Sequence, residues 1–230
     1  RLSILDLDHR SNQPMILDNL SITFNGEIYN FLEVKEDLKA LGYNFKTTSD
    51  TEVLLIGYKE WGIDMLQKIN GMFAFCIYDN VKQTVFCARD RIGVKPFYYY
   101  WKDGDFEICS QLRPLAPNKK INKEAVAMYL DCDYVPCPFS ILQDVFKLPP
   151  GHYMEIHIPS KSKQIKQYWD LKKVKTRHIP YNKAKEELHE LLTDAVKIRL
   201  QSDVPIGSFL SGGIDSALIS SIAGKISPTP

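Results

Sequence analysis

The chain has 230 residues, of which 44% are hydrophobic and 25% charged, and this composition is typical of a globular protein. It excludes a disordered tail, a collagen-like chain or a small disulfide scaffold as the whole molecule. The 29 basic and 28 acidic side chains leave a formal net charge of +1, which disfavours a dedicated nucleic-acid-binding protein. No stretch reaches the roughly 18 apolar residues that span a bilayer. We expect no nucleic-acid partner and no membrane association.

Five scattered cysteines form no Cys-x-x-Cys pair and are odd in number: Cys76, Cys87, Cys109, Cys132 and Cys137. This usage suits a reducing compartment, and the chain opens without a signal-peptide layout, so we expect a cytoplasmic protein. The chain starts directly in an apolar segment and stops at a Ser-Pro-Thr-Pro sequence. Both ends therefore look like cuts in a longer polypeptide.

The hydrophobic patterns predict an antiparallel sheet with helices packed outside it. The predicted elements, in chain order, are a strand at 20–24 that ends at Asn25-Gly26, a helix at 28–41, a helix after Ser49-Asp50 that Gly62 closes, strands at 72–78, 84–88, 97–101 and 106–109, a helix at 123–132 and a strand at 152–158. Consecutive strands without intervening helices favour antiparallel pairing.

A lysine-rich stretch at 159–181 separates this region from a different pattern, and we interpret it as a linker that holds at most one short strand. Asn182 is predicted to cap a helix that runs to Leu200. Residues 206–210 then read as a short buried strand, followed by a glycine loop and a further helix. Strand, glycine loop and helix in this order are typical of the start of an α/β domain.

The loop Ser211-Gly212-Gly213-Ile214-Asp215-Ser216 is the strongest chemical signal. Its glycines leave room for a bulky anion, and a following helix offers unpaired N–H groups and the positive end of its dipole. The sequence therefore predicts a phosphate cradle. The lysine of the common nucleotide-binding loop is missing, and an ordinary strand-to-helix turn is the alternative.

Asn25-Gly26 is the second signal, and two interpretations stay open. Between apolar runs, Asn-Gly usually forms a tight hairpin turn. Because the following residues look helical instead, the pair is also a candidate oxyanion hole, formed by the Asn25 side chain and the Gly26 N–H.

Two weaker patterns are read as structural. Arg89, Arg91 and Lys95 stand beside an aromatic run, as in single-strand nucleic-acid binders, but a strand with charged turns fits the low net charge better. The acidic and cysteine residues at 131–137 fit no standard metal spacing, so we expect no metal held by the protein alone.

Taken together, the motifs resemble those of the glutamine-hydrolysing asparagine synthetase family. In chain order they are Arg1-Leu2-Ser3-Ile4, Asn25-Gly26-Glu27-Ile28-Tyr29-Asn30, Ser49-Asp50-Thr51-Glu52, Gly71-Met72-Phe73-Ala74-Phe75, Ala88-Arg89-Asp90-Arg91-Ile92-Gly93-Val94-Lys95-Pro96, Leu148-Pro149-Pro150-Gly151 and Ser211-Gly212-Gly213-Ile214-Asp215-Ser216. The resemblance implies an α+β N-terminal-nucleophile-type domain, with antiparallel β-sheets layered between helices, followed by the beginning of an α/β ATP-pyrophosphatase domain. We expect the amidotransferase domain at 1–158, the linker at 159–181 and the start of the synthetase domain at 182–230.

The resemblance also implies an activity. One domain releases ammonia from glutamine, and the other uses ATP, with Mg²⁺, to adenylate aspartate before ammonia displaces AMP. Glutamine, aspartate and ATP are thus the expected substrates, and a homodimer is a further expectation.

By motif, the family's site residues fall on the following positions of this chain. For glutamine binding they are Arg1, Leu2, Ser3, Ile4, Leu5, Asn25, Gly26, Glu27 and Asp50; Asn25 and Gly26 would form the oxyanion hole. For ATP binding they are Leu210, Ser211, Gly212, Gly213, Asp215 and Ser216. Arg1 would pair with the glutamine α-carboxylate, whereas Glu27 and Asp50 would hold its α-amino group.

The family's nucleophile, an amino-terminal cysteine, has no counterpart among the five cysteines. We therefore expect this polypeptide to be a fragment without either complete activity. Three alternatives stay open: an amidotransferase that acts on a sugar acid, one that forms a lactam, and a non-catalytic relative.

Overall fold

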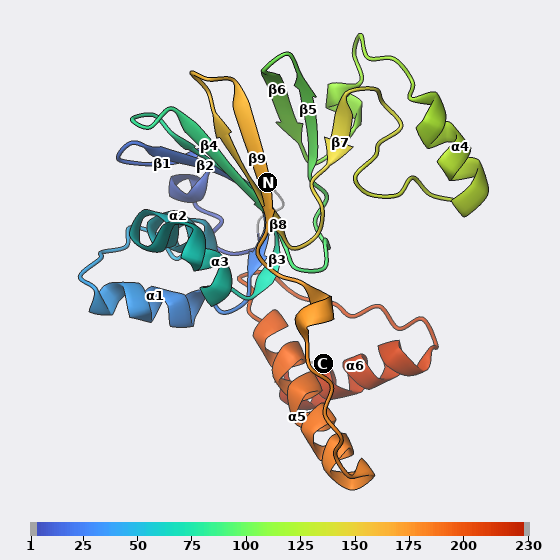
Figure 1. Ribbon diagram of the computed structural model, residues 1–230. Helices are drawn as coiled ribbons and strands as arrows, with labels where there is room; N and C mark the ends of the chain where they lie inside the picture. Colours follow the sequence, from blue (N-terminus) through green and yellow to red (C-terminus); the bar gives the residue numbers. More distant parts are fainter. Residues whose placement is uncertain (1–3, 228–230) are drawn as a thin grey trace. The chain divides into compact units, whose positions relative to one another are not determined.

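The computed structural model describes residues 4–227 and divides them into two compact units (Figure 1). One unit comprises residues 10–171. The other comprises residues 4–9 together with 172–227.

Two antiparallel sheets form the centre of the first unit. The six-stranded sheet has the order β1 (Met15–Leu17), β2 (Leu20–Ile28), β3 (Gly71–Asp79), β4 (Thr84–Arg89), β8 (His152–His157) and β9 (Ser162–Gln167). The three-stranded sheet has the order β6 (Asp105–Cys109), β5 (Tyr98–Lys102) and β7 (Val145–Lys147). Every pairing in both sheets is antiparallel, as the run of consecutive strands predicts.

The two faces of β3 serve two different cores, because successive side chains of a strand point to opposite sides. Ala74 belongs to the buried cluster between the two sheets, against which Cys76 also packs. Phe75 lies on the other face and contacts Phe86 of β4, which stacks on Tyr58 with ring centroids 4.8 Å apart. The inner face thus packs sheet on sheet, and the outer face packs against helices.

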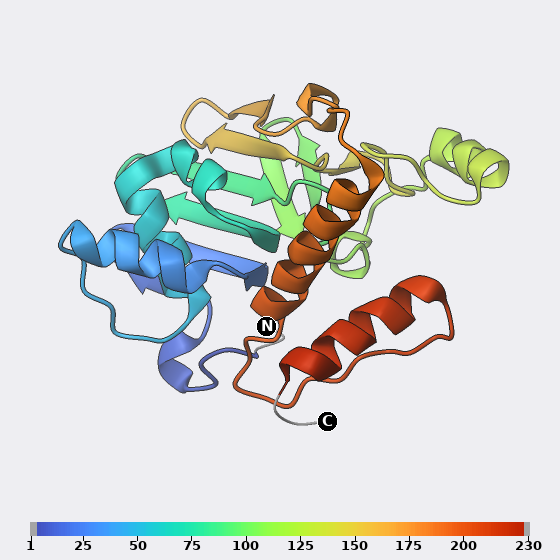
Figure 2. The same ribbon diagram turned by 90° about the horizontal axis from the view of Figure 1, so that it is seen from below.

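Three helices cover that outer face: α1 (Phe31–Ala40), α2 (Asp50–Trp61) and α3 (Met65–Lys68) (Figures 1 and 2). Helix α2 is the central one, and its first eight residues are all buried. The Ser49 hydroxyl accepts a hydrogen bond from the Thr51 N–H and caps the helix, while Gly62 ends it. The end at Gly62 is the one predicted from the sequence, and the helix begins at Asp50, one residue earlier than predicted.

A small buried hydrophobic cluster lies on the outer side of the three-stranded sheet. Leu115 and Leu142 pack there with Val145 against the sheet. Helix α4 (Lys123–Cys132) has the predicted bounds, and Asn122 caps it, but only Ala125 of this helix is buried. The α+β class with layered antiparallel sheets is confirmed.

In the second unit, α5 (Tyr181–Arg199) packs against α6 (Ile214–Ile226) (Figure 2). The Ile4 carbonyl accepts hydrogen bonds from the Asp203 N–H at 2.8 Å and the Ser202 hydroxyl at 3.3 Å. The Asp6 N–H donates to the Asp203 carboxylate at 2.8 Å. These bonds join residues 4–9 to the turn after α5.

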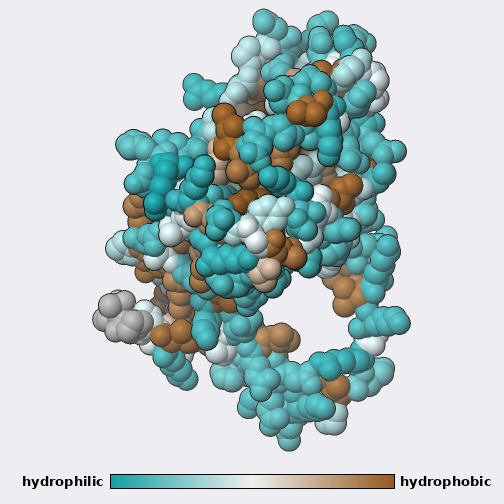
Figure 3. Space-filling model, turned by 90° about the vertical axis from the view of Figure 1, so that its left-hand side faces the viewer, coloured by the Kyte–Doolittle hydropathy of each residue, from teal (hydrophilic) through white to brown (hydrophobic). Residues whose placement is uncertain are grey.

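Short 3-10 turns complete the chain at His9–Ser11, Gly62–Asp64, Arg113–Leu115 and Leu171–Lys173. No helix among residues 4–227 is both long and apolar enough to cross a membrane. The surface seen in Figure 3 is mainly hydrophilic, with small hydrophobic patches.

Three predicted elements need correction. Strand β2 does not end at Asn25-Gly26 but continues to Ile28, because β3 pairs with it along its whole length, and α1 begins only at Phe31. Residues 206–210 form no strand: Phe209 is 98% exposed, and no neighbouring strand of the described second unit offers a ladder. Asn182 does not cap α5, which begins one residue earlier with Pro180 at the cap position.

Candidate functional site

The carboxyl-terminal half of β2 brings three of the predicted site residues together. Asn25, Gly26 and Glu27 follow one another on this strand, opposite Ala74, Phe73 and Met72 of β3. A methyl group on Gly26 would lie 2.1 Å from the Met72 carbonyl oxygen, so only glycine fits where the two strands approach. The tight hairpin turn is therefore wrong for this Asn-Gly pair, and its glycine serves a close strand contact.

One edge of β2 is free of strand pairing beyond Ile22, where β1 ends its contact. The Phe24 N–H points out of this edge and donates to Gln13 Oε1 at 2.7 Å. The Ile28 N–H donates to Asp50 Oδ2 at 3.1 Å. Since alternate N–H groups of a strand point the same way, the Gly26 N–H lies between these two on the same edge. Among the described residues no partner is recorded for it.

The Asn25 side chain lies on the face of β2 that looks toward the second sheet, where a cavity of about 540 Å³ opens. The cavity is lined by Gln13, Thr23, Phe24, Asn25, Ala74, Phe75, Cys76, Pro96, Phe97, Ile108, Cys109, Ser110 and Gln111. No hydrogen bond of the Asn25 amide is recorded within the described part of the chain. Asn25 and Gly26 are adjacent on β2, and a side-chain amide and a backbone N–H are the kinds of donor that stabilise a developing oxyanion.

Asp50 reaches this strand from the first turn of α2 and is 5% exposed. Its carboxylate links the helix to the end of β2 through the Ile28 N–H. Glu27 is 6% exposed and lies one residue before Ile28. The structure thus gathers Asn25, Gly26, Glu27 and Asp50 at one end of the strand, as the resemblance implies.

Glu52 holds the loop that delivers Asp50, and sequence reasoning gave it no role. Its carboxylate accepts from the Thr47 N–H at 2.7 Å, the Thr47 hydroxyl at 2.7 Å and the Lys46 N–H at 2.9 Å. The signal that could have found it is the Ser-x-x-Glu spacing from Ser49, which is typical of a helix start. Here the glutamate reaches further back along the chain than the capping box does.

The loop after β4 is structural, as expected. The Arg89 guanidinium donates to the carbonyls of Lys95, Leu148 and Gly93 at 2.7, 2.7 and 2.9 Å. The buried Asp90 carboxylate accepts N–H groups from Val94 at 2.8 Å and Lys95 at 2.9 Å. The hydrogen bonds of Arg89 and Asp90 hold this loop in its fold.

Cys87 is a buried thiol behind the wall of this site. Cys76 and Cys87 oppose each other across β3 and β4, and Cys76 lines the cavity. Burial raises the pKa of the Cys87 thiol well above its usual value, and its neighbour Cys76 adds to the shift. Cys87 is therefore protonated near neutral pH, and a protonated thiol is a poor nucleophile.

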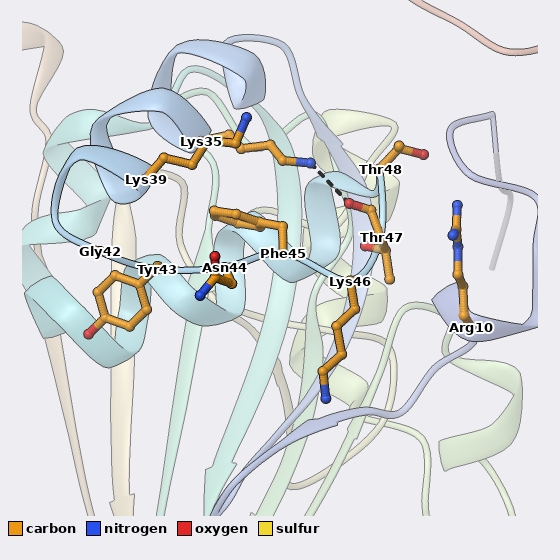
Figure 4. A pocket seen from close by; sticks show the side chains of 10 residues that line it. All are labelled: Arg10, Lys35, Lys39, Gly42, Tyr43, Asn44, Phe45, Lys46, Thr47 and Thr48. Atoms are coloured by element: carbon orange, nitrogen blue, oxygen red, sulfur yellow. Dashed lines mark hydrogen bonds between the residues drawn. The ribbon is translucent and has the colours of Figure 1, made fainter.

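A second pocket of about 630 Å³ lies at the loop between α1 and α2 and is rich in basic side chains (Figure 4). Lys35 Nζ donates to the Thr47 carbonyl at 2.9 Å. Figure 4 shows the side chains of Lys46 and Arg10 pointing in opposite directions. Because these cationic groups do not converge, we assign no anion site to this pocket.

In the second unit, the predicted phosphate loop leads into α6, which begins at Ile214 with Gly213 as its N-cap. Gly212 has a φ of +83°, and nothing lies within 4 Å of the position a methyl group would take. The Ser211 hydroxyl donates to Ser216 Oγ at 3.1 Å, and that hydroxyl donates to the Gly213 carbonyl at 3.0 Å. The loop from Leu210 to Asp215 is exposed, so its backbone has room for an anion.

Three predicted glutamine-binding residues, Arg1, Leu2 and Ser3, lie outside the described residues. Ile4 and the buried Leu5 belong to the second unit, where the Ile4 carbonyl is bonded to the turn after α5.

Within residues 4–227, no three His, Cys, Asp or Glu side chains gather to hold a metal ion. Mg²⁺ commonly binds through one or two carboxylates together with substrate phosphates. Asp215 is the one carboxylate of the described phosphate loop and fits that single role.

Two protein-family models match parts of this chain. Residues 1–169 match the model of the glutamine amidotransferase domain family, and residues 187–230 match that of asparagine synthase. A Bacillus subtilis protein named asparagine synthetase [glutamine-hydrolyzing] 1 is 39% identical over 100% of this chain and 37% of its own length. A Methanocaldococcus jannaschii protein, provisionally named as a glutamine-hydrolysing asparagine synthetase, is 42% identical over 95% of this chain and 46% of its own length. The chain thus spans less than half the length of these relatives.

A solved structure of glutamine phosphoribosylpyrophosphate amidotransferase from B. subtilis, complexed with ADP and GMP, shares the fold. It has a TM-score of 0.50 at 17% identity and covers 95% of this chain and 48% of that one. A structure of the allosteric regulatory enzyme of purine biosynthesis, at 19% identity, also has a TM-score of 0.50 and covers 70% of this chain and 32% of that one. From its sequence match and its fold, the chain belongs to the glutamine amidotransferase domain family.

Proposed function

We propose that this chain supplies the glutamine-hydrolysing site, and the start of the ATP site, of a glutamine-dependent asparagine synthetase. The observation that carries the proposal is the unpaired Gly26 N–H on the open edge of β2, next to the Asn25 amide at a cavity. In the proposed reaction, ATP activates aspartate as aspartyl-AMP, and ammonia released from glutamine displaces AMP. The proposed substrates are glutamine, aspartate and ATP.

The Gly26 N–H and the Asn25 amide would stabilise the oxyanion that develops on the glutamine side-chain carbonyl. Such donors act best when they are fixed before the reaction, because no reorganisation is then needed. The strand pairing with β3 fixes the Gly26 N–H and the backbone from which the Asn25 side chain projects. The nucleophile implied by the family resemblance is an amino-terminal cysteine, and no cysteine of this chain is assigned that role.

Glu27 and Asp50 would receive the α-amino group of glutamine, because buried carboxylates at the end of β2 favour a cation. Arg1 would pair with the α-carboxylate as a bidentate donor, and Leu2, Ser3, Ile4 and Leu5 are the further glutamine-binding positions that the family resemblance implies. This assignment rests on the family resemblance and on the position of the two carboxylates.

The exposed loop before α6 would bind the pyrophosphate portion of ATP, with Leu210 against the nucleotide. Gly212 and Gly213 allow close backbone approach, and the N–H groups at the start of α6 favour an anion. Mg²⁺, when bound with ATP, would neutralise phosphate charge, with Asp215 as its protein contact. The five free thiols suit a cytoplasmic enzyme.

A carboxylate other than aspartate is the alternative acceptor of the ammonia, and one relative carries a name other than asparagine synthetase. The Gibberella zeae protein named Amidase chry2 is 33% identical over 99% of this chain and 34% of its own length. A related amidotransferase that acts on another carboxylate is therefore the alternative function.

The full-length protein that contains this chain tests the proposal. Glutamate release from glutamine and pyrophosphate release from ATP are measured with aspartate and with a panel of other carboxylates. We expect aspartate to stimulate pyrophosphate release and Asn25→Ala to lower glutamate release by about 10²–10³-fold. Asn44→Ala, a change of an exposed asparagine, is the matched control. No ATP-dependent signal with aspartate would reject the asparagine assignment.

A further inference from the structure

The free edge of β2 carries three N–H groups, and side chains from two distant segments take two of them. Gln13, two residues before β1, accepts from Phe24 at 2.7 Å. Asp50, at the start of α2, accepts from Ile28 at 3.1 Å. The Gly26 N–H lies between them, so within the described residues this edge presents a single open donor.

Gln13 also lines the cavity that the Asn25 side chain faces. Gln13 is thus part of the wall of the candidate site, while its amide oxygen accepts from Phe24. Phe24 is buried, with 7% of its surface exposed, so its N–H would lack an acceptor if Gln13 were shortened. A buried N–H without a partner is costly, and it would compete with Gly26 for any carbonyl oxygen placed at this edge.

We propose that Gln13 is a positioning residue for amide hydrolysis: it occupies the Phe24 N–H, so that Gly26 offers the one open backbone N–H on this edge of β2 to the substrate carbonyl. The inference rests on the proposed function and deepens it. Gln13 does not touch the reacting atoms in this account; it acts through the backbone of β2. By accepting from Phe24, Gln13 removes the Phe24 N–H as a competing donor and holds β2, with its Gly26 N–H, in place before the reaction begins.

Three variants of the full-length protein test the role. Gln13→Met removes the acceptor at similar volume, and Gln13→Glu keeps an acceptor oxygen at the same reach. Gln143→Met makes the same change at an exposed glutamine and is the matched control. For each variant, kcat and KM of glutamine hydrolysis, ammonia-dependent synthesis and amide exchange at Phe24 are measured.

We expect Gln13→Met to lower kcat for glutamine about tenfold, less than the loss of a direct oxyanion donor, with KM nearly unchanged. Ammonia-dependent synthesis should be unaffected, amide exchange at Phe24 should rise, and Gln13→Glu should restore kcat. If Gln13→Met does not fold, Gln13→Asn replaces it, because its shorter side chain withdraws the same oxygen.

Each other outcome overturns the proposal, in distinguishable ways. A normal kcat in Gln13→Met with glutamine hydrolysis intact in the wild type rejects the role of Gln13 and leaves the proposed function standing. Equal losses of glutamine-dependent and ammonia-dependent activity mark a merely structural role. A wild-type protein that releases no glutamate from glutamine rejects the proposed function and the role of Gln13 together.

Discussion

Removal of the Glu52 carboxylate is expected to destabilise the first unit and to loosen the start of α2. In Glu52→Ala, the Thr47 N–H and hydroxyl and the Lys46 N–H lose their acceptor in a site where Glu52 is 7% exposed. Hydrogen bonds to a charged group contribute about 1.5–3 kcal/mol each to stability. In the variant the loop can open to water, and the freed donors then bond to water, which offsets part of this loss. We therefore expect the free energy of unfolding to fall by about 3 kcal/mol.

For a unit of this size the loss corresponds to a Tm decrease of about 6–12 °C. Urea unfolding followed by circular dichroism gives the free energy, and thermal unfolding gives Tm. Glu36→Ala is the matched control, because the Glu36 side chain is 70% exposed in its pair with Lys39 and its removal should cost about 0.5 kcal/mol or less. A loss in Glu52→Ala no larger than in Glu36→Ala would refute the reasoning.

Three further changes have defined outcomes. Gly26→Ala should lower the free energy of unfolding by about 3 kcal/mol, because the new methyl group would clash with the backbone of β3. Gly42→Ala should lower it by only about 1–2 kcal/mol, the backbone strain at a φ of +94°, because no atom lies within 4 Å of the new methyl group. Equal losses of the two variants in urea unfolding would contradict this. Phe86→Ala empties a buried site between α2 and the sheet and should cost about 3–5 kcal/mol by the same assay; a cost below 1 kcal/mol would mean that the site is not packed as described. Burial alone would raise the pKa of Asp79, but two backbone N–H groups and the Asn19 amide donate to its carboxylate and hold the pKa below its usual value. Its contribution is therefore present above about pH 4 and lost as the pH falls through the folded-state pKa, so the stability gap between wild type and Asp79→Asn should narrow in acid; a gap independent of pH would contradict the shift.

The sequence predicted those elements whose signals are local. Ser49 and Gly62 mark the ends of α2, and Asn122 marks the start of α4. The central strands were predicted because their apolar and aromatic runs are bounded by turn residues. Strands β1 and β7 and helix α3 have three or four residues each, too few for a period to show.

Two of the errors concern non-local strand pairing. Asn25-Gly26 carries a local turn signal, yet β3 lies opposite and extends the strand through both residues. Residues 206–210 carry a strand signal, yet the described part of their unit supplies no neighbouring strand to pair with.

The candidate site was predictable in part. The motif resemblance placed Asn25, Gly26, Glu27 and Asp50, which the structure gathers at one end of β2. The roles of Gln13 and Glu52 were not predicted, since each depends on a hydrogen bond to a backbone group that only the fold brings near.

A crystal structure of the full-length protein with glutamine bound tests the central claim most directly. The account predicts the side-chain carbonyl oxygen of glutamine within about 2.7–3.1 Å of the Gly26 nitrogen and the Asn25 amide nitrogen. Its α-amino group should lie against Glu27 and Asp50. Glutamine bound at another surface, with the Gly26 N–H facing a protein group, would contradict it.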